Sequence, residues 1–438
     1  MLPIRSTRFA SALAASLCIL ALSRATATPT GKIVLHVGID KGDLRGDDQR
    51  ALQAAVDYVA NLGGGTVLIG PGKYSMRNAL QLRNGVHIRG TPGKTLLIQA
   101  AGRKTALVHD VLKKESHIKL ADPTGFDVGD GIFLQDKAGH GFEVTTATLI
   151  KRLDPKTFLL SCPAESDYLR AREAEVKLSF PLVGGSKIKD AAVEDLILEG
   201  NYRGENSQYL GGCRGGGIYL IGCENVAIRR CSVRRYNGDA ISFQGKSHHL
   251  TIEECVAEHN ANVGMHPGSG SHSCIVRRNV LKDNGYVGLF VCVGVKNVLF
   301  EDNDITDNGG CGISIGYGDT DNIFRKNRVV GNAEMAVLFR RDSPEHGGHR
   351  NVFEKNLFQD NLGPRPDKSN SRPSSAGKAA VVIEGAHHDL VFCDNQFIFS
   401  KPHAGPGVLR DAVSKGLVLK GNVFKNVAAE VEVYAGAD

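Results

Sequence analysis

Hydrophobic and polar positions recur with a period of 24 residues through the second half of the chain, beginning at Cys231. A column of small residues is followed directly by an apolar column, and a second apolar column stands two positions further on. These columns are Ala240, Gly264, Gly288, Gly312 and Ala336, then Ile241, Met265, Leu289, Ile313 and Val337, then Phe243, Pro267, Val291, Ile315 and Phe339. Apolar positions two apart predict short β-strands that bury one face.

Each repeat contains two such segments, for example around Ile241/Phe243 and around Leu250/Ile252, and none keeps a helical period. A repeat of this length, built from short strands and turns, predicts one rung of a parallel β-helix. Residues of one column then lie above one another at about 4.8 Å. Two columns are asparagines, Asn279, Asn303 and Asn327, and Asn260, Asn284, Asn308 and Asn332. They predict ladders of amide hydrogen bonds along the axis.

Residues 43–62 form the one clear amphipathic helix of the sequence. Its apolar stripe consists of Leu52, Ala55, Val56, Val59 and Ala60. Asp47 or Asp48 can cap its N-terminus, and Gly63-Gly64-Gly65 ends it. The terminal rung of a solenoid needs a cover, so we expect this helix to close one end of the coil.

The N-terminus combines basic residues, an apolar run from Phe9 to Leu22 and the small residues Ala25-Thr26-Ala27. This order predicts a secretory signal peptide over residues 1–27, and therefore a secreted or periplasmic protein. The apolar run is short for a membrane span, and no later segment is apolar enough for one. Losing residues 1–27 removes three arginines and no acids, so the formal charge falls from +6 to +3. That charge gives no support for a nucleic-acid partner.

Nine of the ten cysteines remain after removal of residues 1–27, because Cys18 lies in that segment. An odd number in an exported protein implies a free thiol or an intermolecular bond. Cys231 and Cys255 share a column on adjacent rungs, where a disulfide and stacked free thiols both fit. The absence of a Cys-x-x-Cys pair argues against a structural zinc site.

The chain divides into four parts by pattern. Residues 28–112 contain the cap helix and the first rungs, and residues 113–180 lose the rung period, which predicts an inserted β-subdomain. Residues 181–438 carry the remaining rungs, interrupted at 363–378 by a polar loop without core residues.

Two segments resemble a known group of proteins. The string Gly46-Asp47-Asp48, followed by Gly63-Gly64-Gly65-Thr66-Val67 and Pro71-Gly72-Lys73-Tyr74, resembles the N-terminal cap of the pectate-lyase superfamily. Residues 218–360 resemble the right-handed β-helix repeats of the pectate-lyase and alginate-epimerase type. The resemblance implies an all-β, right-handed parallel β-helix that binds a polysaccharide. It leaves the reaction open, because the fold serves lyases, hydrolases, epimerases and inert spacers.

Two columns are expected to face outward, since they alternate with the apolar ones. They are Ser242, His266, Phe290, Ser314 and Leu338, and Gln244, Gly268, Cys292, Gly316 and Arg340. A surface with small residues, an aromatic wall and basic side chains nearby suits an acidic sugar chain. The candidate substrate-binding residues are therefore Ser242, Gln244, Phe290, Arg341 and His272, the last of which also fits an ordinary turn.

His266 is the candidate general base, because histidine titrates near neutral pH. Removal of the proton next to a uronate carboxylate also needs a cation, for which Lys296 and Arg340 are candidates. Asp239 interrupts an apolar column of Val263, Val287, Cys311 and Met335. It is either buried, orienting His266 or sharing its proton, or displaced outward. A surface histidine in a tight turn is the structural alternative for His266.

Asp319 and Asp321 are weak candidates for a calcium site, and an ordinary Asx turn is the favoured explanation. The acid pair of polygalacturonases is not matched, because Gly238, Val263 and Gly216 stand at the corresponding positions. The Asp-Pro-His signature of alginate epimerases is echoed by His266-Pro267 in altered order. We therefore expect β-elimination or C5-epimerisation of uronates. The alternatives are a non-catalytic glycan-binding or adhesive scaffold and a glycoside hydrolase with another acid pair.

Overall fold

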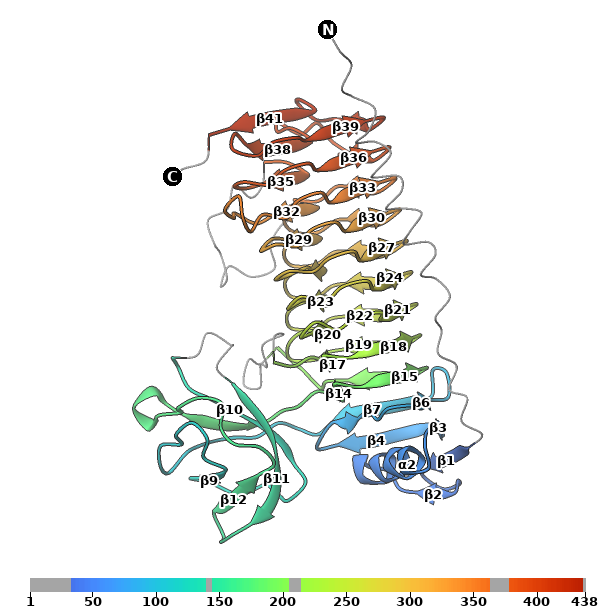
Figure 1. Cartoon of the computed structure of the whole chain (residues 1–438), viewed down its shortest axis with the longest axis vertical. Coiled ribbons are helices and arrows are strands. Elements are labelled where there is room, and N and C mark those ends of the chain that lie inside the picture. The colour runs from blue at the N-terminus through green and yellow to red at the C-terminus, as the bar shows by residue number, and fades with distance from the viewer. Residues whose placement is uncertain (1–32, 139–143, 205–213, 363–377, 436–438) are drawn as a thin grey trace.

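The computed structural model describes residues 33–138, 144–204, 214–362 and 378–435, and its main body is a long parallel β-helix (Figure 1). Three parallel sheets run along the coil, and each full rung adds one strand to each sheet. One rung consists of β20 (Ile241–Gln244), β21 (Thr251–Glu253) and β22 (Val256–Glu258). The sequence predicted two strands per repeat and missed the third, because a three-residue strand turns a single side chain, here Ala257, into the core.

We number the sheets 1 to 3. Sheet 1 has 13 strands in the order β2 (Leu44–Arg45), β1 (Val34–Gly38), β3 (Gly65–Ile69), β6 (Val86–Arg89), β15 (Lys189–Glu194), β18 (Glu224–Arg229), β21, β24 (Ile275–Arg277), β27 (Leu299–Glu301), β30 (Ile323–Arg325), β33 (Val352–Glu354), β36 (Val391–Cys393) and β39 (Val418–Lys420). Sheet 2 has 11 strands in the order β4 (Gly72–Met76), β7 (Thr95–Gln99), β16 (Ile197–Glu199), β19 (Ser232–Arg234), β22, β25 (Val280–Lys282), β28 (Asp304–Thr306), β31 (Arg328–Val330), β34 (Leu357–Gln359), β37 (Gln396–Ile398) and β40 (Val423–Lys425). Sheet 3 has 11 strands in the order β5 (Leu80–Gln81), β14 (Val183–Ser186), β17 (Ile218–Ile221), β20, β23 (Met265–Pro267), β26 (Leu289–Phe290), β29 (Ile313–Ile315), β32 (Val337–Phe339), β35 (Val381–Ile383), β38 (Val408–Asp411) and β41 (Val431–Tyr434).

The asparagine columns form the ladders that the period predicted. Nδ2 of Asn279 donates to Oδ1 of Asn303 at 2.9 Å, and Nδ2 of Asn303 donates to Oδ1 of Asn327 at 2.9 Å. The column that starts at Asn260 repeats this contact with Asn284 at 2.9 Å. These buried amides stay hydrogen-bonded on every rung, so the turns can enter the core without unpaired polar groups.

The cap helix α2 spans Gln49–Asn61, so it begins later than residue 43. The predicted start was wrong because Leu44–Arg45 pairs with β1 as strand β2. Asp48 is the N-cap and accepts hydrogen bonds from the backbone of Arg50 and Ala51. The apolar stripe of α2 is buried against the first rungs, and the helix closes the lower end of the coil in Figure 1, as predicted.

An antiparallel sheet of six strands projects beside the lower rungs (Figure 1). Its order is β8 (Lys104–Ala106), β13 (Glu175–Leu178), β10 (Gly131–Gln135), β11 (Thr145–Arg152), β12 (Thr157–Leu160) and β9 (His117–Lys119), with the 3-10 helix η1 (Arg170–Arg172) before β13. This insertion starts ahead of residue 113, since Lys104–Ala106 already pairs within it. Arg77 of the coil donates to Asp130 of the insertion at 2.7 and 2.6 Å and anchors the sheet.

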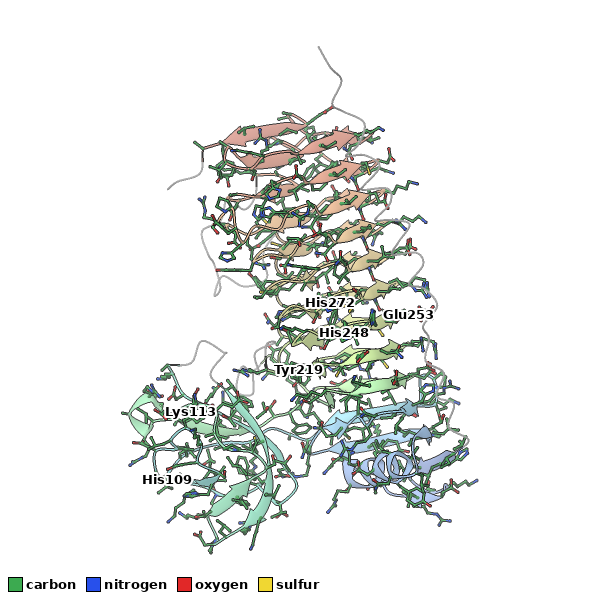
Figure 2. The ribbon with its side chains drawn as sticks, viewed as in Figure 1. His109, Lys113, Tyr219, His248, Glu253 and His272 are labelled. Atoms are coloured by element: carbon green, nitrogen blue, oxygen red, sulfur yellow. The ribbon has the colours of Figure 1, made fainter. Side chains whose placement is uncertain are left out.

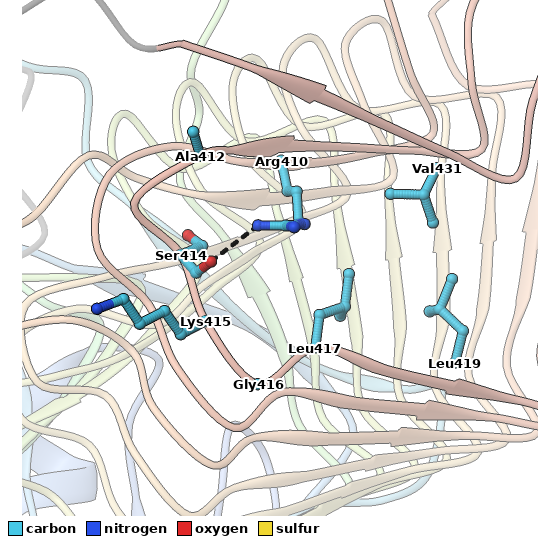
Figure 3. A pocket seen from close by; sticks show the side chains of 8 residues that line it. All are labelled: Arg410, Ala412, Ser414, Lys415, Gly416, Leu417, Leu419 and Val431. Atoms are coloured by element: carbon cyan, nitrogen blue, oxygen red, sulfur yellow. Dashed lines mark hydrogen bonds between the residues drawn. The ribbon is translucent and has the colours of Figure 1, made fainter.

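In the part of the chain that the structure describes, no helix covers the C-terminal end of the coil. A cavity of about 560 Å³ opens there between Arg410, Leu417, Leu419 and Val431 (Figure 3). Nη1 of Arg410 donates to the carbonyl of Ser414 at 2.8 Å, so the Arg410 side chain occupies part of the space along the axis of the coil. The cavity lies at the end of the solenoid, away from the outward columns around His266.

Several sequence-based expectations concern the termini and thiols. The expected signal peptide and nearly all of the polar loop lie outside the described residues. Cys231 and Cys255 are free thiols stacked in one column, so the structure contains the stacked thiols and not the disulfide. Within the described ranges, we find no helix with the length and apolar character of a membrane span.

Candidate active site

The outward column of sheet 3 places the candidate residues on consecutive strands. Tyr219 pairs with Ser242, and Ser242 pairs with His266. Phe290 on the next strand pairs with Ser314. The alternation was predicted correctly, but the expected open surface was wrong: Ser242 is 0% exposed and His266 is 5% exposed. The column faces away from the apolar core and is nevertheless largely shielded from solvent.

Asp239 and His266 form a buried hydrogen-bonded pair. Oδ2 of Asp239 lies 2.7 Å from Nδ1 of His266, which reaches back from the following rung. Oδ1 of Asp239 accepts hydrogen bonds from Nδ2 of Asn262 at 2.6 Å and from the backbone N–H of Val263 at 3.3 Å. The aspartate is therefore buried and not displaced outward. A carboxylate on Nδ1 holds the proton there and leaves the lone pair of Nε2 available to act as a base.

The ring of His266 meets the ring of Phe290 edge to face, with centroids 5.0 Å apart. Such aromatic packing fixes the imidazole plane in addition to the Asp239 contact. Among the described residues, Nε2 of His266 has no hydrogen-bond partner. The pair therefore has one oriented nitrogen with an unused lone pair at the edge of the column.

Arg340 also packs against the ring of Phe290, which His266 contacts. Its guanidinium carbon is 4.5 Å from the centroid of Phe290. Nη1 donates to Oγ of Ser314 at 2.7 Å, and Nη2 donates to the carbonyl of Val291 at 2.9 Å. The side chain crosses Gly316, where an added Cβ would stand 3.1 Å from Nε of Arg340. Because residue 316 is glycine, the guanidinium group of Arg340 can pass over it and contact the ring of Phe290, which in turn contacts His266.

Asp319 is the acidic side chain next to Arg340. It is fully buried, and its Oδ2 lies 3.8 Å from Nη2 of Arg340. Its oxygens also accept the backbone N–H groups of Val295 at 2.9 Å and Gly316 at 3.0 Å. Burial raises the pKa of Asp319 to about 7, although Arg340 and these hydrogen bonds act in the opposite direction. The sequence marked Asp319 only as a weak calcium ligand and did not find this contact.

Asp321, the second candidate calcium ligand, is paired with an arginine. Asp321 accepts hydrogen bonds from Nε and Nη2 of Arg350 at 2.7 and 2.8 Å. Within the described ranges, no three His, Cys, Asp or Glu side chains are grouped so that they could hold a metal ion.

Lys296 and His272 lie in the turns between sheets 3 and 1, beyond the ends of the sheet 3 strands. They belong to a ladder of isolated bridges that connects His248, His272, Lys296 and Thr320, between sheets 3 and 1. The rings of His248 and His272 stack with centroids 5.1 Å apart. Figure 2 labels the two residues close together on the coil. Lys296 is thus six positions beyond the Phe290 column, and the structure does not bring it to His266.

Gln244 and Arg341 complete the set of sequence candidates. Nε2 of Gln244 donates to Oγ of Ser242 at 3.0 Å and to the carbonyl of His266 at 3.3 Å, so it braces the column. Arg341 is half exposed, and its Nη2 lies 3.8 Å from Oδ2 of Asp411. The structure therefore groups Asp239, His266, Phe290 and Arg340, with Ser242 and Gln244 beneath them.

The sequence reasoning missed Asn262, and for Asp319 it missed the contact with Arg340. Asn262, which holds Asp239, belongs to a column of Gly238, Asn262, Tyr286, Gly310 and Glu334, where no pattern distinguishes it. Asp319 did leave a signal, since its column otherwise holds Ser247, Ser271 and Val295, and the carboxylate stands out.

The outer face of sheet 1 offers a contrast in charge. Arg229 donates to Glu194 at 3.0 Å and to Glu253 at 2.8 Å, and Arg277 donates to Glu253 at 2.8 Å. Figure 2 labels Glu253 at the centre of this ladder. The alternating charges neutralise one another, so this face has little attraction for an anionic ligand.

Comparison with known proteins agrees with the fold. The family described as right handed beta helix region matches residues 184–333. The chain folds as a right-handed parallel β-helix. A sequence search of curated proteins finds no match for this β-helix.

Solved structures share this fold at low sequence identity. The A-module of mannuronan C-5 epimerase AlgE6 from Azotobacter vinelandii is 16% identical with a TM-score of 0.56, and the alignment covers 89% of this β-helix chain and 93% of that module. The AlgE4 A-module from the same organism gives 16% and 0.56, covering 91% and 98%. The Dettilon tailspike protein gives 12% and 0.52, covering 86% and 64%. At these identities the likeness establishes the fold, and the site must be argued from its own geometry.

Proposed function

We propose that this β-helix binds an acidic polysaccharide and removes the proton next to the carboxylate of a uronate residue. The observation that carries the proposal is the Asp239–His266 pair, which meets Arg340 at the ring of Phe290. These groups supply a base and a cation, the two functions that such a proton transfer requires.

The chemistry follows from the geometry of the pair. Nε2 of His266 takes the C5 proton, and Asp239 stabilises the resulting imidazolium through Nδ1. Negative charge then moves onto the substrate carboxylate, where Arg340 supplies the compensating cation. Expulsion of the 4-linked glycosidic oxygen, with return of the proton to it, completes β-elimination. Delivery of a proton from solvent to the opposite face of C5, with release of the proton on His266 to solvent, completes epimerisation.

Two further observations support a polysaccharide ligand. Two of the structural neighbours are named mannuronan C-5 epimerases, and they share the β-helix with this chain. The sheet 3 side carries two guanidinium groups close to the column, those of Arg340 and the half-exposed Arg341, and each lies 3.8 Å from an aspartate, Asp319 and Asp411. An exported protein, secreted or periplasmic, is part of the proposal, because its substrate class is extracellular.

A glycan-binding scaffold is the second candidate. The observation that favours it is the burial of His266. A base that is buried from solvent cannot contact a polymer unless the surrounding side chains open. In that function Asp239 and His266 stabilise the rungs, and the ligand binds without reaction.

The test combines two readouts on one set of substrates. The protein is incubated in deuterated buffer with polymannuronate, polyguluronate, polygalacturonate and a glucuronan. Ultraviolet absorbance reports the unsaturated product of elimination, and NMR reports deuterium at C5 without chain cleavage. We expect one of these signals to appear and to be lost in His266→Ala, while His272→Ala, which changes a histidine in the turn between sheets 3 and 1, retains it. Turnover that survives in His266→Ala contradicts the proposed base, and binding without either signal identifies the scaffold.

A further inference from the structure

The turn that follows Arg340 is longer than the turn below it. In one column the step from Val298 to Asn322 is 24 residues, and the next step, from Asn322 to Asn351, is 29. The five additional residues lie between β32 and β33, in the upper part of the coil in Figure 1. We call residues 341–349 the long turn. Whatever holds the long turn also holds the backbone next to the candidate active site.

His387, on the next rung, holds the long turn from above. Its Nδ1 accepts the backbone N–H of Gly348 at 2.8 Å. Its Nε2 lies 3.0 Å from the carbonyl oxygen of Arg340 and 2.8 Å from that of Glu384. Because a backbone N–H only donates and a carbonyl only accepts, the ring carries its proton on Nε2 and has none on Nδ1. His387 is therefore a neutral imidazole with both nitrogens engaged.

His349, in the long turn itself, repeats this arrangement. Its Nδ1 accepts the backbone N–H of His388 at 3.1 Å, and its Nε2 donates to the carbonyl of Pro344 at 2.9 Å. His387 is 1% exposed and His349 is 6% exposed, so solvent does not replace a contact that either ring loses. We call His349 and His387 the turn histidines. As neutral rings, they join the long turn to the turn above it.

A proton on Nδ1 is incompatible with these contacts. It replaces the accepting lone pair by a second donor, which then points at a backbone N–H. Burial lowers the pKa of His387 to about 4, although its contacts with the carbonyls of Glu384 and Arg340 act in the opposite direction. Burial also lowers the pKa of His349. The closed turn therefore excludes the proton that each ring would otherwise bind.

The charged groups around the turn histidines do not reverse this preference. Asp342 and Asp389 favour a proton on the rings, whereas Arg350 and the stacked ring of His388 oppose one. Burial outweighs the two carboxylates. The turns packed below and above contribute the charged side chains of Asp319, Asp321, Asp411 and Lys415.

We propose that the long turn is an acid-sensitive clasp, closed by neutral His349 and His387 and released when both take up a proton. Release frees the backbone of Gly348 and His388, and it withdraws His387 from the carbonyl of Arg340. The inference goes beyond the proposed function, because the clasp needs neither substrate nor reaction. It gives the chain a device that loosens the border of the candidate active site in acidic surroundings.

The direction of the pH dependence follows from the contacts. In the open turn each of the turn histidines titrates near the ordinary histidine pKa of 6.5, whereas the closed turn keeps both neutral at lower pH. The open turn then binds protons that the closed turn excludes, so opening becomes easier as the pH falls below 6.5. For His387, whose pKa in the closed turn is about 4, the opening equilibrium gains about tenfold for each pH unit down to that value.

The test is hydrogen–deuterium exchange of the full chain, read by mass spectrometry at pH values of about 7.5 and about 5. Labelling times are scaled for the pH dependence of exchange in an unfolded peptide. We expect peptides that cover the long turn to open at least about tenfold more at the lower pH. Peptides that cover the ladder from Asn279 to Asn303 should keep their protection, because their amides do not titrate.

Glutamine variants separate the protonation from the packing. In the double variant His349→Gln/His387→Gln, each amide can accept through Oε1 and donate through Nε2, and it does not titrate. We expect this protein to lose the acid response of the long turn. His248→Gln is the matched control, since His248 also lies in a turn between sheets 3 and 1, and it should keep the response. If the double variant has a lowered thermal midpoint at pH about 7.5, His349→Gln alone takes its place and should lose part of the response.

Three results overturn the clasp. They are equal protection of the long turn at both pH values in the wild type, a loss of protection spread evenly over the coil, and an acid response that the glutamine variants retain. The first two need no variant. Turnover is not part of the measurement, so a failure of the proposed reaction leaves this test unaffected.

Discussion

Nδ1 of His266 lies 2.7 Å from Oδ2 of Asp239, and the two residues belong to neighbouring rungs of the coil. Each departs from the chemistry of its own column, and the structure joins the two departures in one hydrogen bond. A carboxylate on one imidazole nitrogen sets the tautomer and makes the other nitrogen basic, which is the arrangement that a proton-abstracting histidine needs.

Replacing Asp239 by Asn should reduce kcat by about 10²–10⁴, because an amide stabilises the imidazolium poorly and can impose the wrong tautomer. Steady-state kinetics on the substrate that gives a signal measures the loss, and circular dichroism checks the fold. Asp321→Asn serves as the control, since its carboxylate pairs with Arg350 at the surface. A kcat for Asp239→Asn within about twofold of the wild type contradicts the role of the pair.

Asp319→Asn should change how stability depends on pH. Burial raises the pKa of Asp319 from its ordinary value of 3.8 to about 7, against the pull of Arg340. Between these values the folded protein keeps a proton that the unfolded chain releases, so the free energy of unfolding falls as the pH rises. Urea titrations at several pH values from 3.8 to about 7 should show this fall in the wild type and lose it in Asp319→Asn. Parallel curves for the two proteins contradict the raised pKa.

Asn303→Ala should destabilise the coil strongly. Oδ1 of Asn303 accepts the backbone N–H of Asn279 at 3.0 Å and its Nδ2 at 2.9 Å, and its own Nδ2 donates to Val276 and Asn327. Each buried group left without a partner costs about 1–3 kcal/mol, so we expect a loss of about 2–4 kcal/mol in unfolding free energy. Asn61→Ala, at an exposed end of α2, is the matched control with a change below about 0.5 kcal/mol. Similar losses in both variants contradict the ladder's contribution.

Asp48→Ala should lower the stability of the cap by about 1 kcal/mol, because Asp48 accepts the N–H groups of Arg50 and Ala51 at the start of α2. Asp47→Ala is the control, since the structure assigns the N-cap to Asp48. Thermal unfolding of both variants measures the difference. Equal midpoints for the two proteins reject the capping assignment.

Comparing residues at equivalent positions of the 24-residue repeat predicted much of the fold. Identical spacing on every turn stacks equivalent residues, so Ile241 and Phe243 point inward and the asparagines form ladders. The same reasoning singled out Asp239 and His266, because each departs from a repeating chemistry. It failed where an element is too short to show a period, as with the strand Val256–Glu258.

The sequence by itself determined the coil, its cap helix and the side chains that share a column, because stacking in register converts a period into a set of neighbours. Only the tertiary structure decided which long side chains meet across columns. Arg340 reaches back to Phe290, whereas Lys296 stays in the turn between sheets 3 and 1. It also decided that Ser242 and His266 are buried, because side chains of the same and neighbouring rungs, Gln244, Asp239 and Phe290, pack against them.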